Sequence, residues 1–322
     1  MGSTSLDGYT LAVEAFNQKY GGIDGRQIAL TVDDTRTDQA TVVSSLQRLF
    51  SLGHKVVLGP TWLDGVAKGA IPVAKMKKAL LVSPSAEFEA FPTSEDGPIT
   101  FYYHSRSEVS ALLKGAAKRG LTRVSLIYEQ EPFAELIKKL LVEMNHGSVS
   151  FVNEVGVQAG ESDFKSILPR ITKNSPQAYL VLVWDERSLL TLLQTLSLKG
   201  DKTPILTIHD GEGWLTKSEF SQHLPHLVYS RFVLKDKEFS RRFKERFGYE
   251  VHLTGSNAYD AMWSVLLALK DGARDAASIR SYLTEHELQT TTFGPAKLTS
   301  AGHFTSSEVE VVEHRSSGIS SK

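Results

Sequence analysis

Short apolar segments with the composition of β-strands alternate with amphipathic helices along most of the chain, and this order restricts the fold more than any other feature. In each helix, apolar side chains recur every three or four positions. We predict strands at residues 28–33, 55–58, 79–82, 124–128 and 178–183, and helices at 40–52, 66–78, 133–144 and 187–198. Strands that alternate with helices pair in parallel and are covered on both faces. The sequence therefore predicts an α/β fold.

The alternation breaks after Leu206, in a loop rich in Gly and His, and then resumes. Phe239, Phe243 and Phe247 recur every four residues, which predicts a helix that packs on a core and ends at Gly248. Further elements are predicted as strands at 227–233 and 308–312 and helices at 258–269 and 277–285. The length of 322 residues, at roughly 100–200 residues per domain, predicts two domains.

Composition excludes several classes of protein. The chain has 36 Lys and Arg against 37 Asp and Glu, without a long basic block, so we expect no nucleic-acid partner. It has no Cys, which excludes disulfides, thiolate catalysis and Cys-ligated metals. The longest apolar runs are far too short to span a membrane. The first residues, Met1 to Ser5, lack the basic start and apolar core of a secretion signal.

The known enzyme motifs are not found in the sequence. It contains no nucleophile elbow, Walker loop, HExxH motif or dinucleotide fingerprint, so we expect neither an enzyme nor a bound cofactor. The Gly-rich run at 21–25 lies between a helix and a strand, the wrong order for a phosphate loop, and predicts a turn. His223 and His226 lack a third ligand for a metal, and Asp33 and Asp34 are interpreted as a solvated strand end.

The strongest candidates for binding lie in loops at the carboxyl ends of predicted strands, where open parallel sheets bind ligands. Three of the four Trp residues, Trp62, Trp184 and Trp214, fall in such loops. A Trp in a loop exposes a large apolar face unless something covers it. Acidic residues accompany them at Asp64, Glu87, Asp185, Glu186 and Asp210.

A series of motifs resembles the leucine/isoleucine/valine-binding proteins, the solute receptors of branched-chain amino acid ABC transporters. The likeness follows the order of that family and covers nearly the whole chain. It is carried by residues 6–17 (LDGYTLAVEAFN), 21–28 (GGIDGRQI), 33–34 (DD), 57–60 (VLGP), 81–86 (LVSPSA), 257–261 (NAYDA) and 293–295 (FGP).

The resemblance implies a type I periplasmic binding protein fold, in which two doubly wound lobes are joined by three hinge crossovers. The crossovers are expected near His104, Ser230 and Thr292. Lobe 1 would then comprise residues 1–104 and 231–292, and lobe 2 residues 105–230 and 293–322. The family begins with a strand and loop ahead of the position matched by Gly2. We therefore expect the sequence to start inside the fold, without its first strand.

The resemblance also implies a ligand site between the lobes. In amino-acid receptors of the family, two positions of the first lobe carry hydroxyl groups, and Leu63 and Glu87 match them here. Phe133 matches a Tyr that lines the cleft. Asp210 matches the acid that pairs with the ammonium group of the ligand. A ligand carboxylate beside Glu87 would meet like charge. The acids and Trp faces favour a cationic or amine-bearing ligand, or a ring stacked on Trp. The residues expected to bind it are Trp62, Leu63, Ser83, Ser85, Glu87, Phe133, Trp184, Asp185 and Asp210.

An acidic ligand is the alternative, and Arg106, Arg187 and His104 lie close enough in sequence to bind it.

The function that the resemblance implies is a receptor that traps a small molecule by hinge closure and presents it to an ABC permease. Such receptors lie in the periplasm or outside the cell, lipid-tethered or free. A ligand-sensing regulatory module of the same fold, without a transport role, is the second hypothesis.

Overall fold

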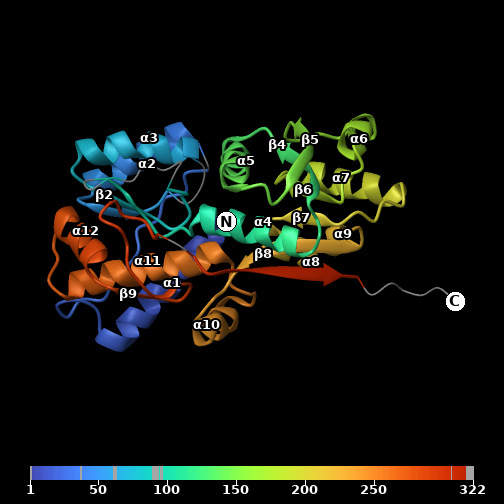
Figure 1. Ribbon diagram of the computed structural model, residues 1–322. Coiled ribbons are helices and arrows are strands. Elements are labelled where there is room, and N and C mark those ends of the chain that lie inside the picture. The colour runs from blue at the N-terminus through green and yellow to red at the C-terminus, as the bar shows by residue number, and fades with distance from the viewer. Residues whose placement is uncertain are drawn as a thin grey trace. The chain divides into compact units, whose positions relative to one another are not determined.

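The alternation of strands and helices predicted from the sequence is present in the structure, a computed structural model (Figure 1). The structure describes residues 2–36, 38–60, 64–88, 94, 97–305 and 307–316, and at residues 2 and 64–68 it describes the backbone alone. The chain divides into two compact units. Unit 1 comprises Met1–His104 and Val233–Ser307, and unit 2 comprises Ser105–Phe232 and Glu308–Lys322.

Unit 2 contains a six-stranded sheet with the order β11-β8-β7-β6-β4-β5, parallel except for β11. Its strands are β4 (Arg123–Glu129), β5 (Ser150–Val157), β6 (Ala178–Leu182), β7 (Ile205–Thr207), β8 (His226–Phe232) and β11 (Val309–Arg315). Its helices are α4 (Ser105–Lys118), α5 (Pro132–Met144), α6 (Phe164–Thr172), α7 (Glu186–Leu198), α8 (Asp210–Thr216) and α9 (Ser218–Ser221).

The strands of unit 2 have two buried faces because their apolar side chains alternate between two cores. Leu126 of β4 and Leu180 of β6 point to the face covered by α4 and α5. Their neighbours Ile127 and Val181 point to the opposite face, which α6, α7 and α9 cover. Side chains of a strand alternate in this way with a period of two. This pattern produces the near-continuous apolar runs that the sequence analysis interpreted as buried strands.

The last strand, β11, is antiparallel to β8 and closes one edge of the sheet. Glu313 fastens it to the unit. Its Oε2 accepts a hydrogen bond from Arg119 Nε of α4 at 3.0 Å, and its Oε1 lies 2.9 Å from His226 Nε2. The guanidinium groups of Arg119 and Arg315 hold the pKa of Glu313 at about 2. The C-terminal strand is therefore part of the ion-paired framework of unit 2.

Unit 1 contains a three-stranded parallel sheet with the order β1-β2-β3 and a two-stranded antiparallel β9-β10 sheet. The strands are β1 (Val56–Leu58), β2 (Leu80–Ser83), β3 (Ile99–Thr100), β9 (Leu288–Thr290) and β10 (Gly294–Ala296). The helices are α1 (Gly2–Tyr20), α2 (Gln39–Ser51), α3 (Asp64–Met76), α10 (Lys237–Phe247), α11 (Leu253–Lys270) and α12 (Ala276–Glu285).

The sheet of unit 1 separates two apolar layers. Leu81 of β2 faces α2 and α3, whereas Leu80 and Val82 face α11 and α12. On the far side of α11, α1 and α10 contribute a third cluster that includes the predicted stripe residues Phe239 and Phe243. Helices α1 and α11 approach closely at Gly8, where a Cβ atom would lie 2.2 Å from the backbone oxygen of Gly255.

Two expectations about the fold were wrong. The segment 28–33 does not form a strand, because the described residues offer its backbone no neighbouring strand to pair with. The third crossover lies after Ser307 rather than near Thr292. The reason is that Leu288, Leu298 and Phe304 all pack into the core of unit 1, which keeps this stretch in that unit.

Other predicted features of unit 1 agree with the structure. The Gly-rich run at 21–25 is a turn closed by a bridge between Ile23 and Arg26, and Gly22 has a φ of 97°. Pro72 lies inside α3, within the helix predicted at 66–78. Among the described residues, no helix combines the length and apolar character that crossing a membrane requires.

Candidate functional site

The loops that follow β4 and β6 in unit 2 are joined by one buried carboxylate. Glu129 ends β4 and is 6% exposed. Its Oε2 accepts hydrogen bonds from the backbone N–H groups of Trp184 and Asp185, both at 2.9 Å. Because β4 and β6 are parallel neighbours, their carboxyl ends lie at the same edge of the sheet. Glu129 therefore fixes the backbone that carries two of the predicted site residues.

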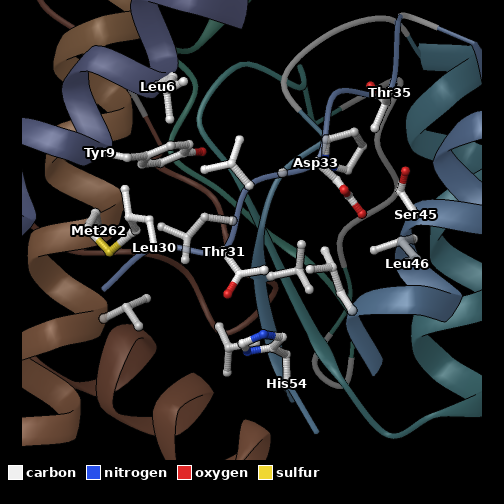
Figure 2. Close-up of a pocket in the computed structure, with 18 of the residues that line it drawn as sticks. Leu6, Tyr9, Leu30, Thr31, Asp33, Thr35, Ser45, Leu46, His54 and Met262 are labelled. Atoms are coloured by element: carbon white, nitrogen blue, oxygen red, sulfur yellow. The ribbon is translucent and has the colours of Figure 1, made fainter. Parts of the chain in front are cut away.

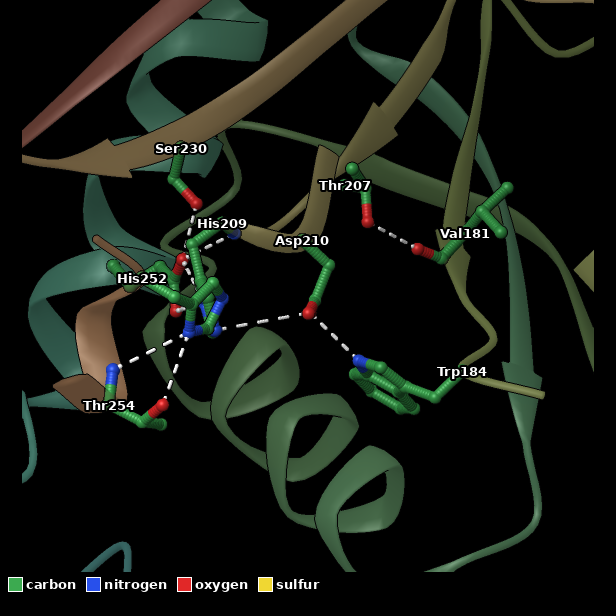
Figure 3. Close-up of polar contacts among 9 residues, drawn as sticks. Val181, Trp184, Thr207, His209, Asp210, Ser230, His252 and Thr254 are labelled. Atoms are coloured by element: carbon green, nitrogen blue, oxygen red, sulfur yellow. Dashed lines mark hydrogen bonds and ion pairs between the residues drawn. The ribbon is translucent and has the colours of Figure 1, made fainter. Parts of the chain in front are cut away.

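Trp184, Asp210 and Phe133 form a cluster at this edge (Figure 3 shows Trp184 and Asp210). Trp184 Nε1 donates a hydrogen bond to Asp210 Oδ2 at 2.8 Å. The rings of Phe133 and Trp184 lie 5.4 Å apart and are tilted by 55°. All three side chains are partly exposed. The described residues use only Oδ2 of Asp210 for hydrogen bonds, so Oδ1 is available to a ligand next to the Trp184 indole.

Asp185 lies next to this cluster but serves as the N-cap of α7. Its Oδ1 accepts hydrogen bonds from the backbone N–H and the hydroxyl of Ser188, both at 2.8 Å. Both hydrogen bonds lower the pKa of Asp185, and the one from the Ser188 backbone N–H has the larger effect. One of its two oxygens is therefore committed to starting α7.

Behind Asp210 lies a buried polar group centred on Glu108, which is fully buried in the first turn of α4. Glu108 Oε1 accepts hydrogen bonds from the Ser230 hydroxyl at 2.5 Å and from the His209 backbone N–H at 2.8 Å. His209 Nδ1 lies 3.0 Å from the same oxygen, and His209 Nε2 lies 4.0 Å from Asp210 Oδ2 (Figure 3). This group joins α4, β8 and the loop before α8.

His209 carries a proton at neutral pH because of these neighbours. Burial lowers its pKa, but the charges of Glu108 and Asp210 outweigh burial and raise the pKa to about 9. An imidazolium between two carboxylates leaves the site with net negative charge, which favours a cationic group in a ligand.

Three predicted residues of unit 1 lie at the end of β2 and in the loop that follows it. Ser83 is fully buried, and its hydroxyl donates to Pro60 O at 2.7 Å and accepts from the Ala86 backbone N–H at 3.0 Å. Ser85 and Glu87 follow in the same loop and are also buried. The Ser83 hydroxyl therefore shapes the loop, and Glu87 places a buried carboxyl group in it.

The remaining predicted residues differ in their surroundings. Trp62 and Leu63 lie outside the described residues. Trp214 lies in α8 and not in a loop as expected, and its ring packs into the core of unit 2 on the face covered by α6 and α7. Arg106, considered for an acidic ligand, forms an ion pair with Glu143 at 3.1 Å, and Arg187 is exposed. Groups of three or more His, Asp or Glu able to hold a metal are absent from the described residues.

Helix α8, which carries Asp210, packs closely on the sheet at Gly211, where there is no room for a side chain. A Cβ atom at Gly211 would lie 2.7 Å from Tyr229 Cβ and 2.8 Å from Thr207 Cγ2, whereas one at Gly213 would meet nothing within 4 Å. We expect Gly211→Ala to displace α8 and lower stability by about 1–3 kcal/mol. Gly213→Ala, the matched control, is expected to be neutral or stabilising by up to about 1 kcal/mol. Chemical unfolding of both variants checks this, and equal stabilities would contradict the close packing.

Comparison with known proteins identifies the family. A model of the periplasmic binding protein family matches residues 1–318. The chain belongs to the periplasmic binding protein family. A curated relative, an uncharacterized protein of Methanocaldococcus jannaschii, is 22% identical over 260 residues. That match covers 74% of this chain and 61% of the relative's own length.

Solved structures of substrate-binding proteins of ABC transporters share the fold. The substrate-binding protein LivJ of Streptococcus pneumoniae, solved with isoleucine, has a TM-score of 0.81 and 21% identity, and the match covers 97% of this chain and 95% of LivJ. A solute-binding protein of Rhodopseudomonas palustris, solved with 3,4-dihydroxybenzoic acid, has a TM-score of 0.78 and 18% identity over 95% of this chain and 88% of that one. The type I periplasmic binding protein fold predicted from the sequence is therefore confirmed.

Sequence reasoning missed Glu108, Glu129 and Ser230 as members of the site. Glu129 closes an otherwise apolar strand, which was a usable signal. Glu108 and Ser230 gave no comparable signal, because one lies in an ordinary helix start and the other in a strand. Their 122-residue separation in sequence is bridged only in the folded chain.

Proposed function

We propose that this periplasmic binding protein is the solute receptor of an ABC importer, working in the periplasm or outside the cell. Its ligand would be a small molecule that carries an amine and an aromatic or other apolar part, trapped between the two lobes by hinge closure. The observation that carries the proposal is the cluster of Asp210, Trp184 and Phe133, in which the Trp184 indole is bonded to one carboxylate oxygen of Asp210 and packs on the Phe133 ring. Family membership supports the receptor role.

The chemistry of the described half-site supports an amine more than an acid. Asp210 offers an acceptor for an ammonium group, and the flat faces of Trp184 and Phe133 suit an apolar or cationic neighbour. On the side of unit 1, the proposal includes Trp62, Leu63, Ser83, Ser85 and Glu87. Relatives solved with isoleucine or with 3,4-dihydroxybenzoic acid indicate that this fold accepts either an amino acid or an aromatic ring.

A thermal-shift screen tests the ligand class. Amino acids, aromatic amines, betaines and aromatic acids are compared as separate groups, since a ligand at 100 times its Kd stabilises the folded state by about 2.7 kcal/mol. We expect amine-bearing compounds to raise the melting temperature and aromatic acids without an amine to leave it unchanged. A shift confined to the acids would overturn the amine assignment and favour the alternative built on Arg106, Arg187 and His104.

Asp210→Asn tests the residue assignment with the ligand found in that screen. We expect binding to weaken about 10- to 100-fold, because a charge-assisted hydrogen bond contributes about 1.5–3 kcal/mol. The matched control is Glu212→Gln, on the same helix, whose exposed carboxylate pairs with Arg231. Titration calorimetry measures both. Equal affinities in the two variants would show that Asp210 is not the ammonium partner.

The permease partner is tested separately. We expect the ligand-loaded protein to stimulate ATP hydrolysis by its permease in lipid vesicles. Ligand binding without any such stimulation would favour the sensory module over the transport receptor.

A further inference from the structure

Helices α2 and α3 end at the same edge of the unit 1 sheet, the edge where β1 and β2 begin. The two helices lie side by side and run in the same direction (Figure 1), because Gly69 lies against Gln39 and Phe50 shares an apolar cluster with Ala74. A short connection leads from each helix into the next strand. The loop after β2, which carries predicted ligand residues, lies at the opposite edge of the sheet.

The chain that leaves α2 and α3 carries positive charge without acidic neighbours. Lys55 precedes β1, Lys75 lies in the last turn of α3, and Lys77 and Lys78 follow that helix. All four side chains are exposed. The sequence has no Asp or Glu at 39–60 or at 69–86. No carboxylate among the described residues pairs with Lys55, Lys77 or Lys78. The two connections adjoin, because Lys55 O accepts a hydrogen bond from Leu80 N–H.

Two exposed apolar side chains lie beside these lysines. Leu52, which follows α2, is 59% exposed, and Met76, the last residue of α3, is 76% exposed. A single exposed apolar residue is common and indicates nothing by itself. Here two of them occupy neighbouring helix ends within a group of lysines. That combination is typical of surfaces that meet a membrane, where basic groups approach the headgroups and apolar side chains enter between them.

The backbone at Lys78 shows that local structure does not explain this charge. Lys78 has a φ of 49°, in the left-handed region where glycine usually ends a helix. Helix α2 follows that preference, since Gly53 occupies the corresponding position with a φ of 93°. The helix dipole accounts for a basic residue in the last turn, such as Lys75, but not for a lysine in a conformation that its own Cβ disfavours.

Helices α1 and α11 bring an aromatic ring and two further lysines to the same edge. Leu269, near the end of α11, and His54, ahead of β1, line one cavity of about 600 Å³ (Figure 2 labels His54). The ring of Tyr20, the last residue of α1, is partly exposed. The Nζ atoms of Lys19 and Lys270 lie 5.1 and 5.0 Å from its centroid. Tyrosine rings with lysines beside them are typical of the membrane–water interface.

Positive charge exceeds negative charge at this edge. Asp24 and Asp271, which lie near Tyr20 and Lys270 in sequence, are each balanced by a basic group, Asp24 by Arg274 at 3.3 Å and Asp271 by Lys270 at 3.6 Å. We call the whole surface the basic edge. It comprises the exposed lysines and the apolar or aromatic side chains beside them, which are Lys19, Lys55, Lys75, Lys77, Lys78, Lys270, Leu52, Met76 and Tyr20.

We propose that the basic edge binds the surface of a bilayer that contains anionic phospholipid. The ammonium groups would lie against the headgroup phosphates, and Leu52 and Met76 would enter between the headgroups. A protein partner fits less well, because lysine is depleted in protein interfaces. Contact at this edge leaves the loop after β2 on the side away from the bilayer. The proposal depends neither on the ligand class nor on a transport role.

Sedimentation of the full chain with lipid vesicles tests the proposal. We expect binding to phosphatidylcholine vesicles that contain about 30% phosphatidylglycerol and little binding to pure phosphatidylcholine. Salt at about 0.5 M should release the protein, because it screens the attraction. Replacement of Lys55, Lys77 and Lys78 by Gln together should weaken binding about 100-fold, at about fivefold for each lysine.

The matched control replaces three exposed lysines of unit 2, Lys165, Lys199 and Lys202, by Gln. This variant has the same net charge as the first, and we expect it to bind like the unmodified chain. Equal losses in the two triple variants would overturn the proposal, because they would show that net charge alone governs adsorption.

Lys78→Gly separates binding from folding. We expect this variant to melt at a higher temperature, because glycine adopts the left-handed conformation without strain, and to bind anionic vesicles about fivefold more weakly. A lysine with a purely structural role would not change the two properties in this way. Unchanged affinity would show that Lys78 does not contact the bilayer and would count against the basic edge.

A fluorescent label tests the apolar contact and the kind of partner. The chain has no Cys, so Met76→Cys accepts a polarity-sensitive dye at one position. The control is Leu198→Cys on α7, where the native side chain is 81% exposed. We expect anionic vesicles to shift the emission to the blue at position 76 and not at 198. Equal shifts would overturn the proposal, as would displacement from vesicles by soluble glycerol phosphate at the same phosphate concentration. Tighter binding to polyglutamate than to vesicles would favour an acidic protein partner instead.

Discussion

Glu108→Ala is expected to lower the free energy of unfolding by about 3–5 kcal/mol. It removes one partner of a buried ion pair and leaves the charge of the other partner buried without compensation. Glu108 is fully buried and accepts hydrogen bonds from Ser230 and from the backbone of His209, besides contacting the His209 ring. Without the carboxylate, the His209 imidazolium loses its main counter-ion, and its pKa should fall from about 9 to below its ordinary value.

Urea unfolding and NMR titration of His209 measure these two effects. Glu143→Ala is the control, since Glu143 is 39% exposed on α5 of the same unit and pairs with Arg106. An exposed pair of this kind contributes about 0–1 kcal/mol. Glu108→Gln keeps the shape and should fall between the two. If Glu108→Ala and Glu143→Ala were equally stable, the buried group would have no structural role.

Asp260 is expected to make stability depend on pH between about 4 and 7. This α11 residue is 2% exposed and accepts hydrogen bonds from the backbone N–H groups of Thr291, at 2.8 Å, and Thr292. Burial raises its pKa from 3.8 to about 7. The folded state thus holds the proton more tightly than the unfolded state. The contribution of protonated Asp260 is complete below about pH 4 and is lost as the pH rises through 7, a total of about 4 kcal/mol.

The difference in stability between the unmodified protein and Asp260→Asn isolates this contribution, because other titrating groups cancel. From pH 4 to pH 7 the difference should move in favour of the variant by about 1.4 kcal/mol for each pH unit, and it should be constant above pH 7. The control is Asp271→Asn, at the exposed end of the same helix. Curves that stay parallel for Asp260→Asn would show that its carboxyl group ionises as readily in the folded as in the unfolded state.

Most of the fold followed from local sequence pattern. The 3.6-residue periodicity identified α2, α5, α7 and α10 within about two residues, because one apolar face of each packs on a core. The pattern did not find β5 or α6. In β5 only Val155 and Val157 are buried, so this edge strand lacks the continuous apolar run of its neighbours. The position of the third crossover depended on distant packing of Leu288 and Phe304, which local pattern does not contain.

The candidate site was predicted only in part. Loop position at strand ends, together with the family resemblance, brought Phe133, Trp184 and Asp210 into one group, and the structure places them in contact. The supporting residues Glu108 and Ser230 could not be predicted from the sequence, because the partners in a buried polar network are distant from one another in sequence. Asp185 was chosen for its charge, but its position before a helix also matched the preference for an N-cap.

The close packing of α1 on α11 has a consequence for the newly made chain. Phe16, Ala12 and Val13 of α1 are buried against a helix that begins at Leu253. At about 5–20 residues per second, a ribosome needs roughly ten to fifty seconds to travel from one helix to the other. Throughout that interval the apolar face of α1 lacks its final partner. Nascent chains stalled before residue 253 are therefore expected to attract chaperones, and release from them should coincide with the emergence of α11.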